Sequence, residues 1–330
     1  MKADQVDYAR ALGEAKKREI LAMIVGLRYA DTPAFLNVTQ IIASYTFDAT
    51  GTATLNSLPN PGGPNALATG TLSYSNHPTF TFTPTTGQDY ARAYIHPLAP
   101  ALIFPLASTG IPIDLLMRIT VQSIGGLRNA TMLGGPTGDG MPEFFELLHI
   151  LRRLQLAGEM AVQYMHGNSV EQVTLLMGSG QSPKSAAEEK DLARARALLK
   201  VAEQSTGYEL VYGQSATVPG GQIPVETRSI LAILTDLGAE IAVPPDDVQA
   251  GTTKSTLALI GGETRPVIIV HSGRKPPSDV YAEIGYRASH YWIEDDDFDS
   301  KYALTVVQSL TALAEVGDRS HAPIVTVPVN

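Results

Sequence analysis

Thr, Ser and aromatic residues alternate with a period of two from Asn37 to Thr86, a pattern typical of half-buried β-strands with one polar face. The alternation breaks at Ser57–Asn65, where the sequence SLPNPGGPN is a strong turn signal. The stretch contains few carboxylates and one histidine. We therefore expect it to offer backbone edges and a contact face rather than catalytic groups.

Apolar residues at helical spacing predict helices on both sides of these strands. The predicted helices span Asp4–Tyr29, Gly87–Ile95, Asp114–Ile124, Pro142–Tyr164, Ala186–Glu203, Glu226–Leu237 and Asp297–Ala314. Further strands are predicted at Val170–Met177, Tyr208–Tyr212, Glu240–Val243, Val267–His271, Val280–Arg287, Tyr291–Ile293 and Ile324–Val329, with a loop at Pro244–Asp247. Tight connections between strands, with helices between some of them, favour an α+β fold with antiparallel or mixed sheets and helices packed on one face.

The segment GSGQSPKS is polar, built of small residues and followed by a charged helix, as is typical of a linker. It divides the chain into two predicted halves: an N-terminal α+β half at 1–178 that carries the Thr-rich strands, a linker at 179–185, and a C-terminal α+β half at 186–330.

Composition narrows the possible partners. The chain has 330 residues, a formal net charge of -9, 44% hydrophobic residues and no cysteine. The scattered basic residues and the acidic excess argue against a nucleic-acid partner, and the lack of cysteine removes disulfides and thiolate chemistry. The longest apolar runs are too short or too interrupted to cross a bilayer, and no signal peptide precedes Asp4, so we expect no transmembrane segment.

A run of carboxylates at Glu294–Asp299 is the densest acidic cluster of the chain. Its alternate aspartates, which resemble the start of a calcium-binding loop, are Asp295, Asp297 and Asp299. The EF-hand pattern also requires Gly at position six and Glu at position twelve, but Ser300 and Val306 occupy these positions. We therefore predict that Asp296 or Asp297 caps the following helix, and keep the three aspartates as weaker metal candidates.

His271, Ser272 and His290 lie on predicted neighbouring strands just before the acidic run. Adjacent residues of a strand point to opposite faces, so His271 cannot activate Ser272, and only His290 could serve a Ser/His/Asp arrangement. The chain has no G-x-S-x-G motif. A hydrolase that uses His290 and the 294–299 acidic run stays an alternative.

A glycine-rich segment, Gly134–Gly140, precedes a predicted helix and could hold an anion on its backbone. It lacks the Walker lysine and the dinucleotide spacing, so we expect a flexible loop and no cofactor. The remaining histidines, at positions 77, 96, 149, 166 and 321, form no zinc motif.

Four segments carry a resemblance to a known family: Leu27–Phe47, Pro78–Pro100, Val121–Ala130 and Asp299–Val316 with the terminal PIVTVPV. They are similar to uncharacterised proteobacterial proteins, many of them predicted lipoproteins. That family has no assigned activity, so no catalytic residue follows from the resemblance. It implies a location on the periplasmic side of the cell envelope, after removal of a leader and a lipidated cysteine. The chain starts at Met1-Lys2 with neither, which leaves a cytoplasmic location as the alternative.

These observations favour a non-enzymatic structural or assembly protein of the bacterial envelope, which forms a homo-oligomer or docks to an envelope partner through its Thr-rich strands. A ligand-binding module with a pocket between the halves is the first alternative. The hydrolase centred on His290 is the second.

Overall fold

The computed structural model describes residues 2–32, 36–56, 65–84, 87–131, 140–166, 171–178, 180, 183–202, 205–213, 221–256, 263 and 265–316. The chain forms two compact units: residues 1–33 with 86–318, and residues 34–85 with 319–330. We refer to the first as the larger unit and describe each unit by itself.

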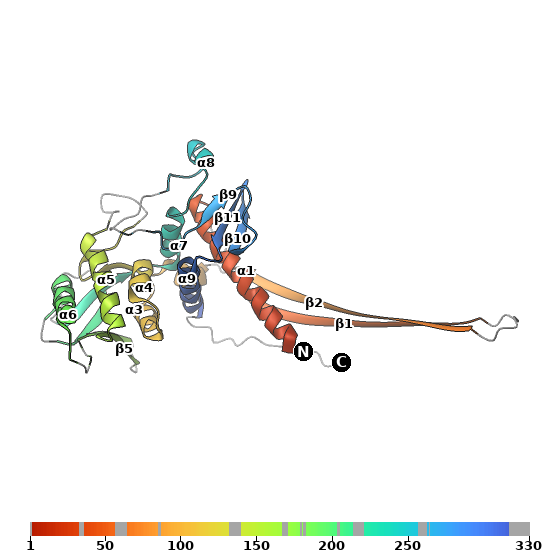
Figure 1. The fold of residues 1–330 in the computed structure, drawn as a ribbon, viewed down its shortest axis with the longest axis horizontal. Coiled ribbons are helices and arrows are strands. Elements are labelled where there is room, and N and C mark those ends of the chain that lie inside the picture. Colours follow the sequence, from red (N-terminus) through yellow and green to blue (C-terminus); the bar gives the residue numbers. More distant parts are fainter. Residues whose placement is uncertain are drawn as a thin grey trace. The chain divides into compact units, whose positions relative to one another are not determined.

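The smaller unit contains one long hairpin. Strands β1 (Leu36–Asn56) and β2 (Asn65–Pro84) pair antiparallel along their whole length, as Figure 1 shows. The register contains one irregularity, between Val38 and Gln40. The two strands predicted from the period-two alternation are thus confirmed, while residues 57–64 of the predicted turn lie outside the described residues.

A six-stranded mixed sheet forms one layer of the larger unit, with strand order β4-β3-β8-β7-β6-β5. Its strands are β3 (Val121–Ile124), β4 (Leu127–Arg128), β5 (Met160–His166), β6 (Glu171–Met177), β7 (Gly207–Tyr212) and β8 (Gln222–Thr227). Only β7 and β8 pair in parallel; the other neighbours are antiparallel. This architecture confirms the predicted α+β class.

The sheet also corrects the predicted domain boundary. Strands β5 and β6 precede residues 179–185, whereas β7 and β8 follow them, yet β6 and β7 are neighbours in one sheet. The predicted linker is therefore a connection within the larger unit and not a boundary between two halves.

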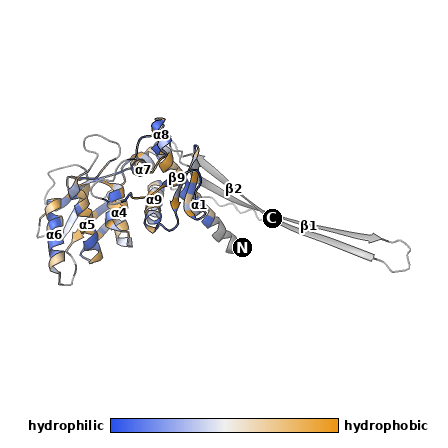
Figure 2. Ribbon diagram, turned by 45° about the horizontal axis from the view of Figure 1, so that its top comes forward, coloured by the Kyte–Doolittle hydropathy of each residue, from blue (hydrophilic) through white to orange (hydrophobic). Residues whose placement is uncertain are grey.

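Helices α3 (Pro100–Ile103), α4 (Ile113–Thr120), α5 (Pro142–Leu156) and α6 (Ala186–Leu199) lie beside this sheet, with the 3-10 segment η2 (Phe104–Thr109) (Figure 1). Each of the longer helices carries both hydrophilic and hydrophobic residues, as Figure 2 shows for α4, α5 and α6. Helix α5 packs between α4 and α6. Its buried face includes Phe144, Leu147 and Leu151, and burial of this face holds the layer on the sheet.

A second, three-stranded sheet consists of β9 (His271–Gly273), β10 (Val280–Tyr286) and β11 (Ser289–Glu294) in the antiparallel order β10-β11-β9. The predicted hairpin around Ala288-Ser289 is confirmed. Helix α1 (Lys2–Arg28) packs against β10, α7 (Ile230–Ala239) and α9 (Phe298–Val316). The short elements α2 (Gly87–Tyr90) and the π-helix η1 (Ala91–Ile95) form the predicted helix at Gly87–Ile95.

Two predicted helices are too long because their last residues form strands. The helix predicted at Asp114–Ile124 ends at Thr120, and β3 follows directly. Gly125 and Gly126 both have positive φ values and make the tight turn into β4. The helix predicted at Pro142–Tyr164 ends at Leu156, and β5 then pairs with β6.

Three other boundaries differ from the predictions. Glu226 and Thr227 belong to β8, and α7 begins after Ser229, whose side chain caps the helix by accepting from Ala232 N at 3.2 Å. The strand and loop predicted at 240–247 are instead a turn followed by helix α8 (Pro245–Gln249). Only His271 of the strand predicted at Val267–His271 is in a strand, and the predicted strand Ile324–Val329 lies outside the described residues.

No helix in the described ranges combines the length and the apolar character that a membrane crossing requires.

Candidate functional site

The register of the β1–β2 hairpin sorts its residues into two faces. Directly paired residues share a face, and successive residues of a strand alternate between faces. One set of pairs is apolar or aromatic with a single Asn: Ile41–Phe80, Ala43–Pro78, Tyr45–Asn76, Phe47–Tyr74, Ala49–Leu72, Gly51–Gly70, Ala53–Ala68 and Leu55–Ala66. We call it the apolar face of the hairpin.

The alternate pairs form the polar face of the hairpin. They are Gln40–Thr81, Ile42–Thr79, Ser44–His77, Thr46–Ser75, Asp48–Ser73, Thr50–Thr71, Thr52–Thr69, Thr54–Leu67 and Asn56–Asn65. Each strand alone shows only alternation, so the contrast between the faces depends on how the strands pair. The period-two alternation predicts half-buried strands with one polar face, and antiparallel pairing about the predicted turn gathers the apolar residues of both strands on the other face.

The acidic run at Glu294–Asp299 serves as a helix start. Asp297 Oδ1 accepts from Ser300 N at 3.2 Å, which is the predicted cap of α9, and Asp297 Oδ2 accepts from Ser300 Oγ at 2.6 Å. Burial favours the protonated carboxyl, but hydrogen bonds from Ser300 and Arg265 outweigh it, so the pKa of Asp297 lies below its ordinary value.

The three metal candidates each contact a cation of the chain. Arg265 contacts Asp297 at 2.9 Å and Asp299 at 2.8 Å, and Lys301 contacts Asp295 at 2.9 Å. Within the described part of the chain, no group of three or more His, Asp or Glu side chains is placed to hold a metal ion. The geometry of the run thus favours capping and ion pairing over metal binding.

The three-stranded sheet does not bring a serine to His290. Ser272 pairs with Tyr291, so it shares the face of Tyr291, and the alternation of β11 places His290 on the opposite face. His290 Nδ1 instead lies 2.8 Å from Glu283 Oε1. This arrangement contradicts a hydrolase built from Ser272 and His290.

His271, the other histidine of this sheet, packs on an aromatic ring. Its imidazole stacks on the Trp292 ring with a centroid distance of 5.8 Å, and its Nε2 lies 3.7 Å from Glu294 Oε1. Such contacts fix the ring on a half-exposed sheet face and supply no nucleophile beside it.

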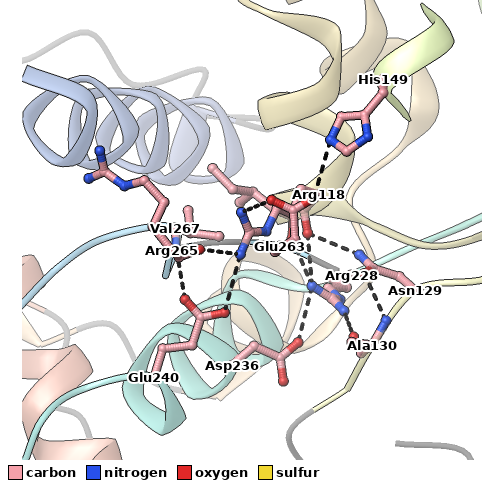
Figure 3. A network of polar contacts seen from close by, with 11 residues as sticks. Arg118, Asn129, Ala130, His149, Arg228, Asp236, Glu240, Glu263, Arg265 and Val267 are labelled. Atoms are coloured by element: carbon pink, nitrogen blue, oxygen red, sulfur yellow. Dashed lines mark hydrogen bonds and ion pairs between the residues drawn. The ribbon is translucent and has the colours of Figure 1, made fainter. Parts of the chain in front are cut away.

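A buried arginine, Arg228, is the centre of a polar network in the larger unit (Figure 3). Its residue is only 7% exposed. Nε donates to Gln122 Oε1 at 3.0 Å, Nη1 donates to Arg118 O at 3.2 Å, and Nη2 donates to Ala130 O. Asp236 of α7 forms an ion pair with Nη1 at 3.2 Å. Burial lowers the pKa of Arg228, and the negative charge of Asp236 opposes this lowering. The hydrogen bonds and the ion pair from several elements satisfy the buried guanidinium.

Arg118 extends this network toward the second sheet (Figure 3). Its Nη1 lies 2.8 Å from Glu263 Oε2, and its Nη2 donates to Arg265 O at 3.0 Å and lies 4.0 Å from Glu240 Oε1. Glu240 also accepts from Val267 N at 2.8 Å. Burial raises the pKa of Glu240, while the charge of Arg118 works in the opposite direction.

A cavity of about 40 Å³ lies inside this network, lined in part by Arg118, Asn129, Arg228 and Glu240. It has room for water molecules but not for an organic substrate. Because the charges are mutually paired, the network ties α4, β3 and α7 together and presents no free nucleophile. Neither arginine was predicted as a site residue from the sequence, although an isolated Arg in an apolar run, as in LLMRITV, is a signal of a buried charge.

Two further features noted in the sequence lie at the edge of the Arg228 network. His149 Nε2 lies 3.5 Å from Glu263 Oε1 at the edge of the network. Residues 134–139 of the glycine-rich segment lie outside the described residues, whereas Gly140, with a φ of 68°, packs so closely on Ala130 that a Cβ would lie 2.6 Å from its N.

Comparison with family models, curated proteins and solved structures finds no match for this chain, so its function has to be argued from the geometry above.

Proposed function

We propose that this chain is a non-enzymatic assembly protein whose hairpin associates with the hairpin of a second copy through the apolar face. The observation that carries the proposal is the register of β1 and β2, which gathers Ile41, Phe47, Leu72, Tyr74 and Phe80 on one face of a two-stranded sheet. Among the described strands no third strand extends this sheet. A two-stranded hairpin is marginally stable in water unless another layer or strand covers it.

The size of the face suits a stable dimer. A strand of 20 residues is about 65 Å long and two strands are about 10 Å wide, so one face covers about 650 Å². Two such faces would bury about 1,300 Å², which reaches the range of specific interfaces. Between Gln40 and Thr81 of the two strands, Asp48 and His77 are the acidic and basic residues, and both belong to the polar face. Charge repulsion therefore does not oppose contact between two apolar faces.

Light scattering after size exclusion, over a range of protein concentrations, tests the proposal. The test compares two variants at adjacent positions of β1. Phe47→Asp places a charge on the apolar face, whereas Thr46→Asp places the same charge on the polar face of the same strand. We expect a dimer or larger oligomer for the wild type and Thr46→Asp, and a monomer for Phe47→Asp. A wild type that is monomeric at every concentration overturns assembly, and equal dissociation by both variants overturns the choice of face.

The family resemblance of segments such as Leu27–Phe47 supports the periplasmic side of the envelope as the place of assembly. Fractionation of cells that express the natural gene with a C-terminal tag checks this. Recovery of the protein in the cytoplasmic fraction alone would contradict the envelope location without affecting the hairpin interface.

A further inference from the structure

A second cavity, of about 420 Å³, lies in the larger unit at the C-terminal end of α1. This volume is within the range of small-molecule pockets. Its walls come from the end of α1, from α7 and from the loop after α8: Leu27, Arg28, Tyr29, Ala30, Thr235, Ala239, Gly251, Thr252, Thr253, Lys254 and Ser255.

The end of α1 is held firmly at this cavity. Ala30 adopts the left-handed conformation with a φ of 61°, Asp31 N donates to Gly26 O at 2.9 Å, and Ala30 N donates to Leu27 O at 3.1 Å. These bonds form a Schellman cap, in which the left-handed position is usually glycine. The wall around Arg28 is therefore preorganised, which favours binding because little order has to be created.

Arg28 is a half-buried cation without an acidic partner. Its Nη2 donates to Lys254 O at 2.7 Å and to Thr256 Oγ1 at 3.3 Å. In the described part of the chain its guanidinium has no ion pair, its buried Nε has no acceptor, and its Nη1 makes no hydrogen bond. Burial lowers the pKa of Arg28. A desolvated cation is normally paired with an anion.

The ionised side chains that line the cavity are both basic. Arg28 and Lys254 are the ionised side chains of the lining, which includes no Asp or Glu. The carbonyl end of α1 helps to hold a cation but supplies no ion pair. By contrast, the arginines of the buried network, Arg118 and Arg228, each face a carboxylate of the same chain. In a chain with a net charge of -9, this cavity is a local site of positive charge.

The rest of the lining is suited to an apolar group. Leu27 and Ala239 contribute aliphatic surface, whereas the ring of Tyr29 is buried against Tyr286 at a centroid distance of 5.2 Å. The Tyr29 hydroxyl donates to Asp247 Oδ2 at 2.6 Å and also contacts the Tyr291 hydroxyl, so the ring is fixed and its polar group is directed to these partners. An apolar body can therefore lie beside the guanidinium.

We propose that this cavity binds a small organic carboxylate, with the carboxylate on Arg28 and Lys254 and the apolar body against Leu27 and Ala239. The site belongs entirely to the larger unit, so it neither requires nor excludes association through the hairpin.

Isothermal titration of the full chain with 4-phenylbutyrate, octanoate and the neutral 4-phenylbutanamide tests the proposal. We expect the acids to bind and the amide to bind at least about tenfold more weakly, because a hydrogen bond to a charged group is lost. Arg28→Gln should weaken binding of both acids by at least about tenfold. Arg18→Gln, on an exposed position of the same helix, should leave it unchanged.

Ala239→Leu provides a second variant if Arg28→Gln fails to fold, because it fills the cavity and keeps the guanidinium. It should reduce binding of 4-phenylbutyrate at least about tenfold. The proposal is overturned if neither acid binds the wild type, if the amide binds as well as the acids, or if a folded Arg28→Gln or Ala239→Leu protein binds like the wild type.

Discussion

The larger unit and the hairpin use the same alternation of polar and apolar residues but cover their apolar surfaces differently. In the larger unit, helices and sheets supply facing layers, and side chains such as Phe144, Leu147 and Tyr291 are fully buried. In the hairpin, the apolar face belongs to a sheet that has two strands among the described residues. Local sequence signals are thus sufficient for two strands to pair, whereas a covered hydrophobic core requires a second layer. We therefore expect the apolar face of the hairpin to be an association surface.

The largest expected effect concerns the core of the larger unit. Arg228→Met removes a buried cation, breaks the ion pair to Asp236 and takes away the guanidinium donor of the Ala130 carbonyl oxygen. We expect a loss of about 3–5 kcal/mol in the free energy of unfolding, measured with denaturant and a probe of the larger unit.

The matched control is Arg153→Met, which breaks an ion pair to Asp191 at a position where the Arg153 side chain is 56% exposed. Its cost should be below about 1 kcal/mol. Equal losses in both variants would show that the Arg228 network does not hold the larger unit together.

The register of the hairpin can be tested next. Thr50 and Thr71 are directly paired, and the chain has no cysteine that could compete. Thr50→Cys with Thr71→Cys should form a disulfide and stabilise the hairpin by about 3 kcal/mol through the constraint on the unfolded chain. Mass spectrometry after alkylation detects the bond. Faster oxidation of Thr50→Cys with Leu72→Cys would place the register one residue away, so that each face would combine the polar residues of one strand with the apolar residues of the other.

A smaller effect is expected at the start of α9. Asp297→Ala removes the cap to Ser300 and should cost about 1 kcal/mol of unfolding free energy. Because the pKa of Asp297 is lowered in the folded protein, its contribution is present above the ordinary aspartate pKa of about 3.9 and is lost as the pH falls through the folded value. Denaturant unfolding from pH 6 to pH 2 should show a weaker acid dependence in Asp297→Asn. A rise in melting temperature with calcium would contradict the capping role.

The smallest effect is expected at the tip of the hairpin. Deletion of residues 56–66 removes the predicted turn and breaks the last two strand pairs, Leu55–Ala66 and Asn56–Asn65, all within the smaller unit. The unfolding free energy of the larger unit should change by less than about 0.5 kcal/mol, as for changes away from a core. Differential scanning calorimetry checks this. A loss of several kcal/mol would show that the two units depend on each other for stability.

Features that depend on residues close in sequence could be predicted from the sequence. The alternation in β1 and β2, the β10–β11 hairpin, and the cap between Asp297 and Ser300 all follow from local pattern and turn chemistry. The α+β class follows from the order of these elements. Even the apolar face of the hairpin is contained in the sequence once the strands are paired about their turn.

Only the tertiary structure decided the features that depend on distant partners. Val121–Ile124 and Met160–His166 are short segments that suit either helix or strand, and pairing with β8 and β6 made them strands. Pairing between distant strands also joins β6 and β7, which lie on either side of residues 179–185, in one sheet. Arg228 is buried by groups about a hundred residues away, and Arg28 by the loop at Lys254. The environment of a charge is set by the elements that pack around it, so the same residue type becomes a structural link at Arg228 and a candidate binding group at Arg28.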